Sequence, residues 1–68
     1  MDNITTARER VEKELEDLSE KIKKLQDFIN DNPLYSKLSE TQQALLACQL
    51  DFMKGYARVL DLRLTLWS

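Results

Sequence analysis

Apolar residues in the first half of the chain follow a helical spacing. From residue 3 to residue 31 there is neither glycine nor proline. The apolar positions, which alternate in steps of four and three from Val11 onward, are Ile4, Val11, Leu15, Leu18, Ile22, Leu25 and Ile29. This spacing places them on one narrow face of a helix, and the opposite face is polar. The pattern predicts an amphipathic helix over residues 3–31.

The segment that follows carries the residues that end one helix and begin another. The tripeptide Asn-Asp-Asn precedes Pro33, and proline disfavours the helical conformation of the residue before it. Ser39 followed by Gln42 has the pattern of a capping box, which begins a helix. The second helix is therefore predicted over residues 39–67. A connection of only about seven residues favours antiparallel packing, so the predicted fold is all-α, a two-helix antiparallel hairpin forming a single domain over 1–68.

The second helix has apolar residues in two adjacent rows. The first row is Leu46, Leu50, Met53, Ala57, Leu60, Leu64 and Trp67. The second row is Leu45, Gln49, Phe52, Tyr56, Val59, Arg63 and Leu66. Because the first helix offers one apolar row, a hairpin covers only one of the two, and we expect the second row to be buried by another copy or a partner. A kinked first helix that covers both rows is the alternative.

Length and composition also favour self-association. A chain of 68 residues is near the lower limit for a self-sufficient core, and natural chains of this size add disulfides, a metal or oligomerisation. Cys48 is the only cysteine and there is no histidine, so neither an internal disulfide nor a bound metal is expected. The predicted assembly is a homo-oligomeric helical bundle. Its expected interface consists of Leu45, Gln49, Phe52, Tyr56, Val59, Leu66 and Trp67, the last because a single copy would leave it exposed.

Charge and apolar content narrow the class of partner. The net charge is −2 and the pI about 5.0, which argues against a protein that binds duplex nucleic acid. The longest apolar runs are too short to cross a bilayer, and no signal peptide is recognisable. A single cysteine fits a reducing compartment. We therefore expect a cytoplasmic protein that does not bind membranes.

The residues that enzymes use are missing. Without histidine there is no Cys–His or Ser–His pair, and one glycine cannot form a phosphate-binding loop. We expect no catalytic residue and no cofactor. That one glycine, Gly55, lies inside the second helix at a cost of about 1 kcal/mol relative to alanine. With Ala44 and Cys48 it forms an edge of small residues, consistent with close approach of a neighbouring helix, and Cys48 is expected to be a core residue.

Three polar residues of the second row form the first candidate binding site. Gln49, Tyr56 and Arg63 recur every seven residues. In one interpretation they are polar coiled-coil positions that fix register and oligomeric state. In the other they line a pocket between copies, where an amide recognises a base edge, an aromatic ring stacks and a guanidinium binds phosphate. Arg8 is expected near Arg63, and the two guanidiniums would attract an anion unless Asp61 neutralises them.

The turn between the helices carries the second candidate site, which we call the corner cluster. Its members are Lys24, Phe28, Tyr35 and Lys37. They are expected beside the amino end of the second helix, where free N–H groups favour anions. The alternative interpretation is a hydrophobic staple that closes the hairpin, formed by Phe28, Leu34, Tyr35 and Leu38.

Two stretches of the sequence resemble a type of small phage and prophage protein with a helical hairpin. The stretches are "RVEKELEDLSEKIKKLQDFI" and "LYSKLSETQQALLACQLDFMKGYARVLDLRL". The positions that carry the resemblance are Lys24, Leu25, Phe28, Ile29, Tyr35, Leu45, Leu46, Gln49, Met53, Tyr56, Leu60 and Arg63. The architecture is similar to that of phage counter-defence sponges, which bind the cyclic nucleotide signals of bacterial immune systems such as CBASS and Thoeris. The local motifs of those sponges are not found here, so no contact residue is transferred from them.

The resemblance implies a non-enzymatic phage protein that sequesters a small anionic cyclic nucleotide at protomer interfaces in the host cytoplasm. The candidate ligand-binding residues are Arg8, Tyr56 and Arg63, or Lys24, Tyr35 and Lys37. Two alternatives stay open. One is a helical inhibitor or adaptor that binds a host or phage protein. The other is a purely structural oligomeric bundle.

Overall fold

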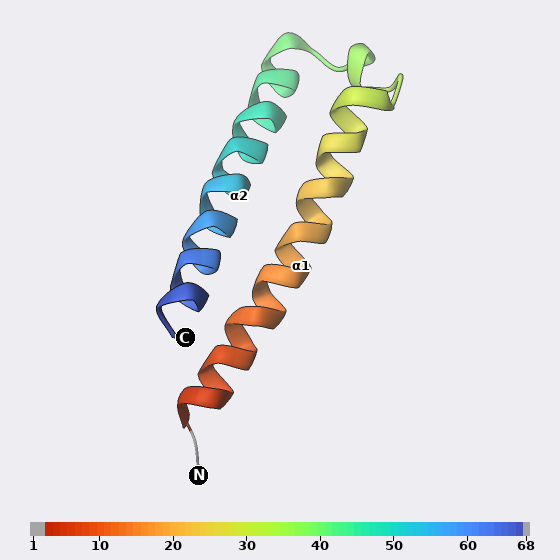
Figure 1. Ribbon diagram of the computed structural model, residues 1–68. Helices are drawn as coiled ribbons and strands as arrows, with labels where there is room; N and C mark the ends of the chain where they lie inside the picture. The colour runs from red at the N-terminus through yellow and green to blue at the C-terminus, as the bar shows by residue number, and fades with distance from the viewer. Residues whose placement is uncertain (1–2, 68) are drawn as a thin grey trace.

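The computed structural model describes residues 3–67, with side chains from residue 6 onward, as a long helical hairpin (Figure 1). Helix α1 spans Asn3–Asp31 and helix α2 spans Glu40–Leu66, with a short 3-10 helix, η1, at Tyr35–Lys37 between them. The molecule measures 52 × 15 × 14 Å. The start of α1 and the end of α2 lie at the same end of the molecule, opposite the turn. The predicted all-α antiparallel hairpin is confirmed.

The turn begins with hydrogen bonds that end α1 and reverse the chain. The backbone N–H of Asn32 donates to the carbonyl of Phe28 at 3.2 Å, which completes the last turn of α1. The side-chain oxygen of Asn32 then accepts a hydrogen bond from the N–H of Leu34 at 2.9 Å, a turn that asparagine commonly forms ahead of proline. The hydroxyl of Ser36 donates to the carbonyl of Pro33 at 2.9 Å. The helix end before Pro33 is confirmed, whereas η1 is an element that the sequence pattern did not predict.

Helix α2 begins with the predicted capping box. The hydroxyl of Ser39 accepts a hydrogen bond from the N–H of Gln42 at 3.1 Å. In return, the side-chain oxygen of Gln42 accepts from the N–H of Ser39 at 3.3 Å. The pair satisfies two backbone donors that a helix start otherwise leaves without partners. Glu40 places a negative charge in the first turn, where the helix dipole favours it.

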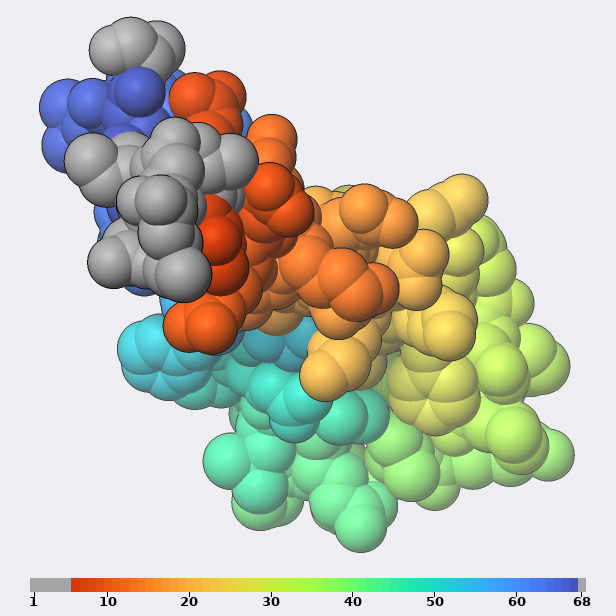
Figure 2. All heavy atoms as spheres, turned by 90° about the horizontal axis from the view of Figure 1, so that it is seen from below, coloured from red at the N-terminus to blue at the C-terminus, as the bar shows by residue number. Residues whose placement is uncertain are grey.

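The core lies between α1 and the first row of α2. Leu60 is completely buried, and Val11, Leu18 and Leu50 are nearly so. Val11, Leu18 and Leu60 form one cluster, and the partly buried residues that pack against it are Leu15, Ile22, Met53, Ala57, Leu64 and Trp67. Figure 2 shows the atoms of α1 and α2 lying against each other along the molecule. The apolar row of α1 therefore covers the first row of α2, although the side chain of Ile4, the first member of the α1 row, lies outside the described part.

Two expectations about individual residues are wrong. Trp67 is partly buried within a single chain, because its ring packs against the cluster of Val11, Leu18 and Leu60. The expectation that a single copy leaves Trp67 exposed is therefore wrong, and its place in an interface between copies stays a prediction. Cys48 is exposed rather than part of the core, because it lies on a side of α2 that α1 does not cover.

Over the residues described, neither helix contains a stretch long and apolar enough to cross a membrane.

Candidate functional site

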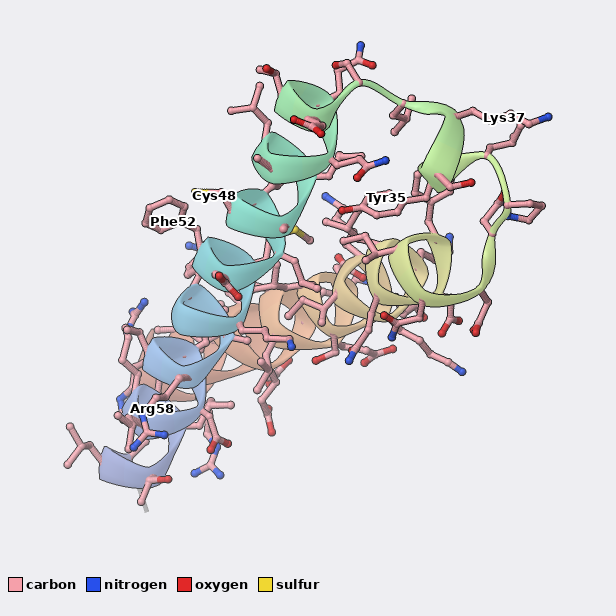
Figure 3. All side chains as sticks on the ribbon, turned by 90° about the horizontal axis from the view of Figure 1, so that it is seen from above. Tyr35, Lys37, Cys48, Phe52 and Arg58 are labelled. Atoms are coloured by element: carbon pink, nitrogen blue, oxygen red, sulfur yellow. The ribbon has the colours of Figure 1, made fainter. Side chains whose placement is uncertain are left out.

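The second row of α2 forms an exposed apolar surface. Phe52 is 74% exposed and Leu66 is 85% exposed. The other large apolar residues exposed along α2 are Leu45, Tyr56, Val59 and Leu62. Figure 3 shows Phe52 and Cys48 projecting from α2 on the side away from α1. The expectation that one hairpin leaves the second row in water is confirmed, and the alternative of a first helix that covers both rows is wrong.

Burial of this surface by another molecule would be favourable. Fully burying one such side chain contributes about 1.5–3 kcal/mol, while bringing two proteins together costs about 4–15 kcal/mol. Burying several of these side chains from each of two molecules would offset much of that cost. Exposed apolar surfaces of this kind mark sites of interaction in soluble proteins, so this side of α2 is the candidate functional site.

Leu62 belongs to this surface and was missed by the sequence reasoning. It is 51% exposed. It falls in neither row, because alternating steps of four and then three that begin at Leu45 or Leu46 do not reach position 62. A search for further apolar residues spaced by three and four from Phe52 and Val59 would have found it. The exposed apolar surface of α2 is therefore wider than the second row alone.

The amide and the aromatic ring of the first candidate site lie next to an apolar hollow. The hollow is lined by Leu45, Cys48, Gln49, Phe52, Met53 and Tyr56. The side-chain nitrogen of Gln49 lies 3.8 Å from the sulfur of Met53, a weak contact that leaves the amide's oxygen available. The hollow is open to solvent on a single chain, whereas small-molecule sites bury most of the ligand's surface. A ligand in this hollow would be enclosed only if a second molecule covered it.

Arg63 lies at the far end of the same surface. Its guanidinium lies 5.9 Å from the centre of the Trp67 ring, within the range of a cation–π interaction. With Leu66, these two residues line a small hollow. In the described part of the chain no carboxylate lies within 4.0 Å of Arg63. The possibility that Asp61 neutralises it is therefore not realised, and Arg63 presents its charge to solvent.

Arg8 differs from Arg63 in having an acidic neighbour. Its Nε atom lies 3.9 Å from a carboxylate oxygen of Glu12, one turn along α1. Arg8 belongs to the first turns of α1 and Arg63 to the last turn of α2, and these two helix ends lie at the same end of the molecule (Figure 1). Glu12 therefore offsets part of the charge of Arg8, whereas no described carboxylate does so for Arg63. The ion pair is largely exposed and therefore weak.

Within the corner cluster, Tyr35 has a structural role. Its ring packs edge-on against Phe28, with 6.0 Å between ring centres. Its hydroxyl donates to the carbonyl of Gln43 at 3.1 Å. The side-chain amide of Gln43 donates in return to the carbonyls of Tyr35 at 2.9 Å and Leu38 at 3.2 Å. These bonds hold η1 against the start of α2 and favour the staple interpretation, except that Leu34 is exposed.

The lysines of the corner cluster are not brought together around Tyr35. Lys37 points outward while Tyr35 points towards α2 (Figure 3). Lys24 lines an open hollow that also contains Asp27 and Asp31, and two carboxylates beside one ammonium disfavour an anion. The corner cluster is therefore a less favourable site for a negatively charged ligand than the surface around Tyr56 and Arg63.

Comparison with known protein families finds a match that covers almost the whole chain. The sequence model of a family described as Sequestin matches residues 5–66. No curated protein and no solved structure matches the chain.

Proposed function

The chain belongs to the Sequestin family, whose name describes a sequestering protein, and from that premise we propose that it binds and withholds a small anionic cyclic nucleotide. The nucleotide is an immune signal of an infected bacterium, and the chain is a phage protein that acts in the host cytoplasm. It works by binding without catalysis, so the nucleotide is held intact. The ligand lies between copies of the chain.

The observation that carries this proposal is the exposed surface of α2 with the Arg63 cation at one end, which pairs with no carboxylate among the described residues. Tyr56 offers a ring for stacking on a base, and the amide oxygen of Gln49 can accept a hydrogen bond from a base edge. Arg63 supplies a guanidinium, which binds phosphate through two parallel hydrogen bonds. Enclosing these groups beneath a second copy would remove them from water and strengthen each interaction.

Among the candidate residues, Tyr56 and Arg63 are the main ligand groups in this proposal. Arg8 is auxiliary, because Glu12 already lies beside it. The corner residues are the alternative site. They are disfavoured because Tyr35 uses its hydroxyl within the chain and Lys24 lies beside two carboxylates.

A panel of nucleotides tests the function directly. The purified protein is heated with cyclic dinucleotides, cyclic trinucleotides and cyclic ADP-ribose isomers, and its melting temperature is recorded. A ligand present at a hundred times its dissociation constant contributes about 2.7 kcal/mol, and each kcal/mol raises Tm by about 4–8 °C in a domain of this size. We expect one class to raise Tm by about 10 °C or more. Failure of every class, with no small molecule released on denaturation and detected by mass spectrometry, would refute the proposal.

Substitutions locate the site. Arg63→Ala and Tyr56→Ala should each abolish the ligand-induced shift while leaving the sedimentation of the protein unchanged. Lys54→Ala is the matched control, because it removes a positive charge from an exposed position on the solvated side of α2. If Lys24→Ala and Lys37→Ala abolish the shift and Arg63→Ala does not, the ligand binds at the corner cluster instead.

The second candidate function is that of an inhibitor or adaptor that presents the same surface to another protein. The predominantly apolar lining of the hollow beside Phe52, which contains no charged residue, favours it. An adaptor would show no thermal shift with any nucleotide. It would also sediment as a single hairpin or as a mixture of species until its partner is added.

A further inference from the structure

The exposed surface of α2 contains a second helix-packing pattern. Its members are Leu45, Cys48, Phe52, Gly55, Val59, Leu62 and Leu66, and we call this set the outer seam. The steps between them alternate three and four, which is the spacing of residues that pack against another helix. All seven are exposed. The first row of α2 has the same spacing and packs on α1, so α2 has two seams and only one partner within the chain.

We propose that two copies of the chain pair antiparallel along their outer seams, about a two-fold axis near Gly55. This proposal rests on the proposed function in one respect, which is that the partner is a second copy of the chain. Antiparallel pairing about Gly55 matches each apolar residue with another. Leu45 faces Leu66 of the second copy, Cys48 faces Leu62, and Phe52 faces Val59.

The sizes of these residues suit that register. The largest side chain, Phe52, meets the smaller Val59, and Leu62 meets the small Cys48. At the axis Gly55 meets its own equivalent, where the absence of Cβ lets two helix backbones approach closely. A Cβ built on Gly55 meets nothing within 4 Å in the single chain. The packing of one hairpin therefore does not require a glycine there, but the axis of a pair would.

Charges beside the outer seam favour the antiparallel orientation. Asp51 and Arg58 are exposed and lie on the same flank of the outer seam, on either side of Gly55. Antiparallel pairing brings Asp51 of each copy opposite Arg58 of the other, giving two attractive pairs. A parallel pair would instead place Arg58 beside Arg63 of the second copy, and like charges repel. The surface is thus complementary to itself in one orientation, as a two-fold interface requires.

The same pairing completes the candidate ligand site. Gln49, Tyr56 and Arg63 lie on the other flank of the outer seam. In the antiparallel pair Gln49 of one copy lies opposite Arg63 of the second, and the two Tyr56 rings meet near the axis. One edge of the pair therefore carries two aromatic rings at its centre and a guanidinium towards each end, a set that neither copy has alone.

Cysteine cross-linking tests the orientation with no ligand present. In the antiparallel pair the two Cys48 thiols lie on opposite sides of the axis, roughly 20 Å apart at about 1.5 Å per residue. A disulfide requires Cα atoms within about 7 Å. Mild oxidation of the native protein should therefore give no covalent dimer, whereas a parallel pair would join Cys48 to Cys48. The Leu62→Cys variant should form covalent dimers, because its new thiol faces Cys48 of the second copy.

Controls separate pairing from chance collision. Leu62→Cys combined with Cys48→Ser should not cross-link, and neither should Lys54→Cys combined with Cys48→Ser, since both leave one thiol with no opposing partner. Sedimentation of the native protein should show a particle at least twice the 8.0 kDa of one chain. A Cys48–Cys48 disulfide in the native protein, or a single-hairpin mass at micromolar concentration, would overturn the proposal. A cross-linked pair that ignores every nucleotide would leave the pairing intact and refute only the proposed function.

Discussion

The two apolar seams of α2 are alike in spacing and composition and differ in what covers them. Leu60 and Val59 are adjacent in sequence, yet Leu60 has no exposed surface and Val59 is 53% exposed. The first row is covered by α1 within the chain, whereas every residue of the outer seam is exposed in the part of the chain that the structure describes. One helix therefore has a covered seam that stabilises the hairpin and an exposed seam that, in our proposal, joins two hairpins. Substitutions in the two seams should have different consequences.

The largest effect is expected in the covered seam. Leu60→Ala should destabilise the fold by about 2–5 kcal/mol, because truncating a completely buried leucine loses its contacts and leaves a cavity. Urea unfolding followed by circular dichroism would measure the loss. Val59→Ala is the control from the next position, and should leave the unfolding of the hairpin itself nearly unchanged. Equal losses in the two variants would remove the distinction between the seams.

A smaller effect, on assembly alone, is expected in the outer seam. Phe52→Ala should weaken the pair of hairpins by about 1.5–3 kcal/mol for each copy, because the ring no longer has surface to bury. Its helix content at high protein concentration should be retained. Sedimentation equilibrium over a range of concentrations would measure the change. Ala47→Glu, on the solvated side of α2, is a matched control that should not alter the mass, and an unchanged mass for Phe52→Ala would contradict the role of the seam.

Gly55→Ala is expected to raise the stability of the helix and to lower the affinity between the two copies. Alanine is favoured over glycine in a helix by about 1 kcal/mol, and the space around Gly55 in one hairpin is open. A methyl group at the axis of the pair would instead hold the two backbones apart. The helix should therefore become more stable in dilute protein while the dissociation constant of the pair rises. If the stability of the helix and the affinity of the pair both increase, the two copies do not cross near Gly55.

The smallest effect is expected from the charges that flank the outer seam. Asp51→Arg should weaken the pair by about 0.2–1 kcal/mol for each lost ion pair, with some further repulsion, because such pairs are exposed at a rim. Combining Asp51→Arg with Arg58→Asp should restore affinity, since the exchanged charges again face each other. Added salt should reduce both the loss of affinity in the single variant and its recovery in the double variant. If the effects of the two substitutions on the free energy of pairing simply add, Asp51 and Arg58 do not contact each other across the pair.

Features that depend on local spacing were predicted from the sequence. The capping box of Ser39 and Gln42, the helix end before Pro33 and the surplus apolar row of α2 all follow from the residues themselves and their neighbours. The predicted helices of residues 3–31 and 39–67 agree with Asn3–Asp31 and Glu40–Leu66. Ser39 and Trp67 are the residues that cap α2 at its two ends.

Features that depend on contacts across the hairpin were not predicted. The reciprocal hydrogen bonds of Tyr35 and Gln43 span the turn, and no periodicity relates two such residues. The partial burial of Trp67 depends on how far α1 extends beside the end of α2. Cys48 was assigned to the core by residue type, whereas its position around the helix axis places it on the exposed side. The ligand groups remain a prediction, because a site between copies cannot be assembled from one chain.

The position of Trp67 makes it an intrinsic fluorescence probe of the protein. It is the only tryptophan, and it packs on the core at the end of the hairpin farthest from the turn. Its emission should shift to longer wavelength when that end frays, before the turn opens. Because the Arg63 guanidinium lies over the indole, an anion that draws Arg63 away would also change the fluorescence. Unlabelled protein can therefore be titrated directly.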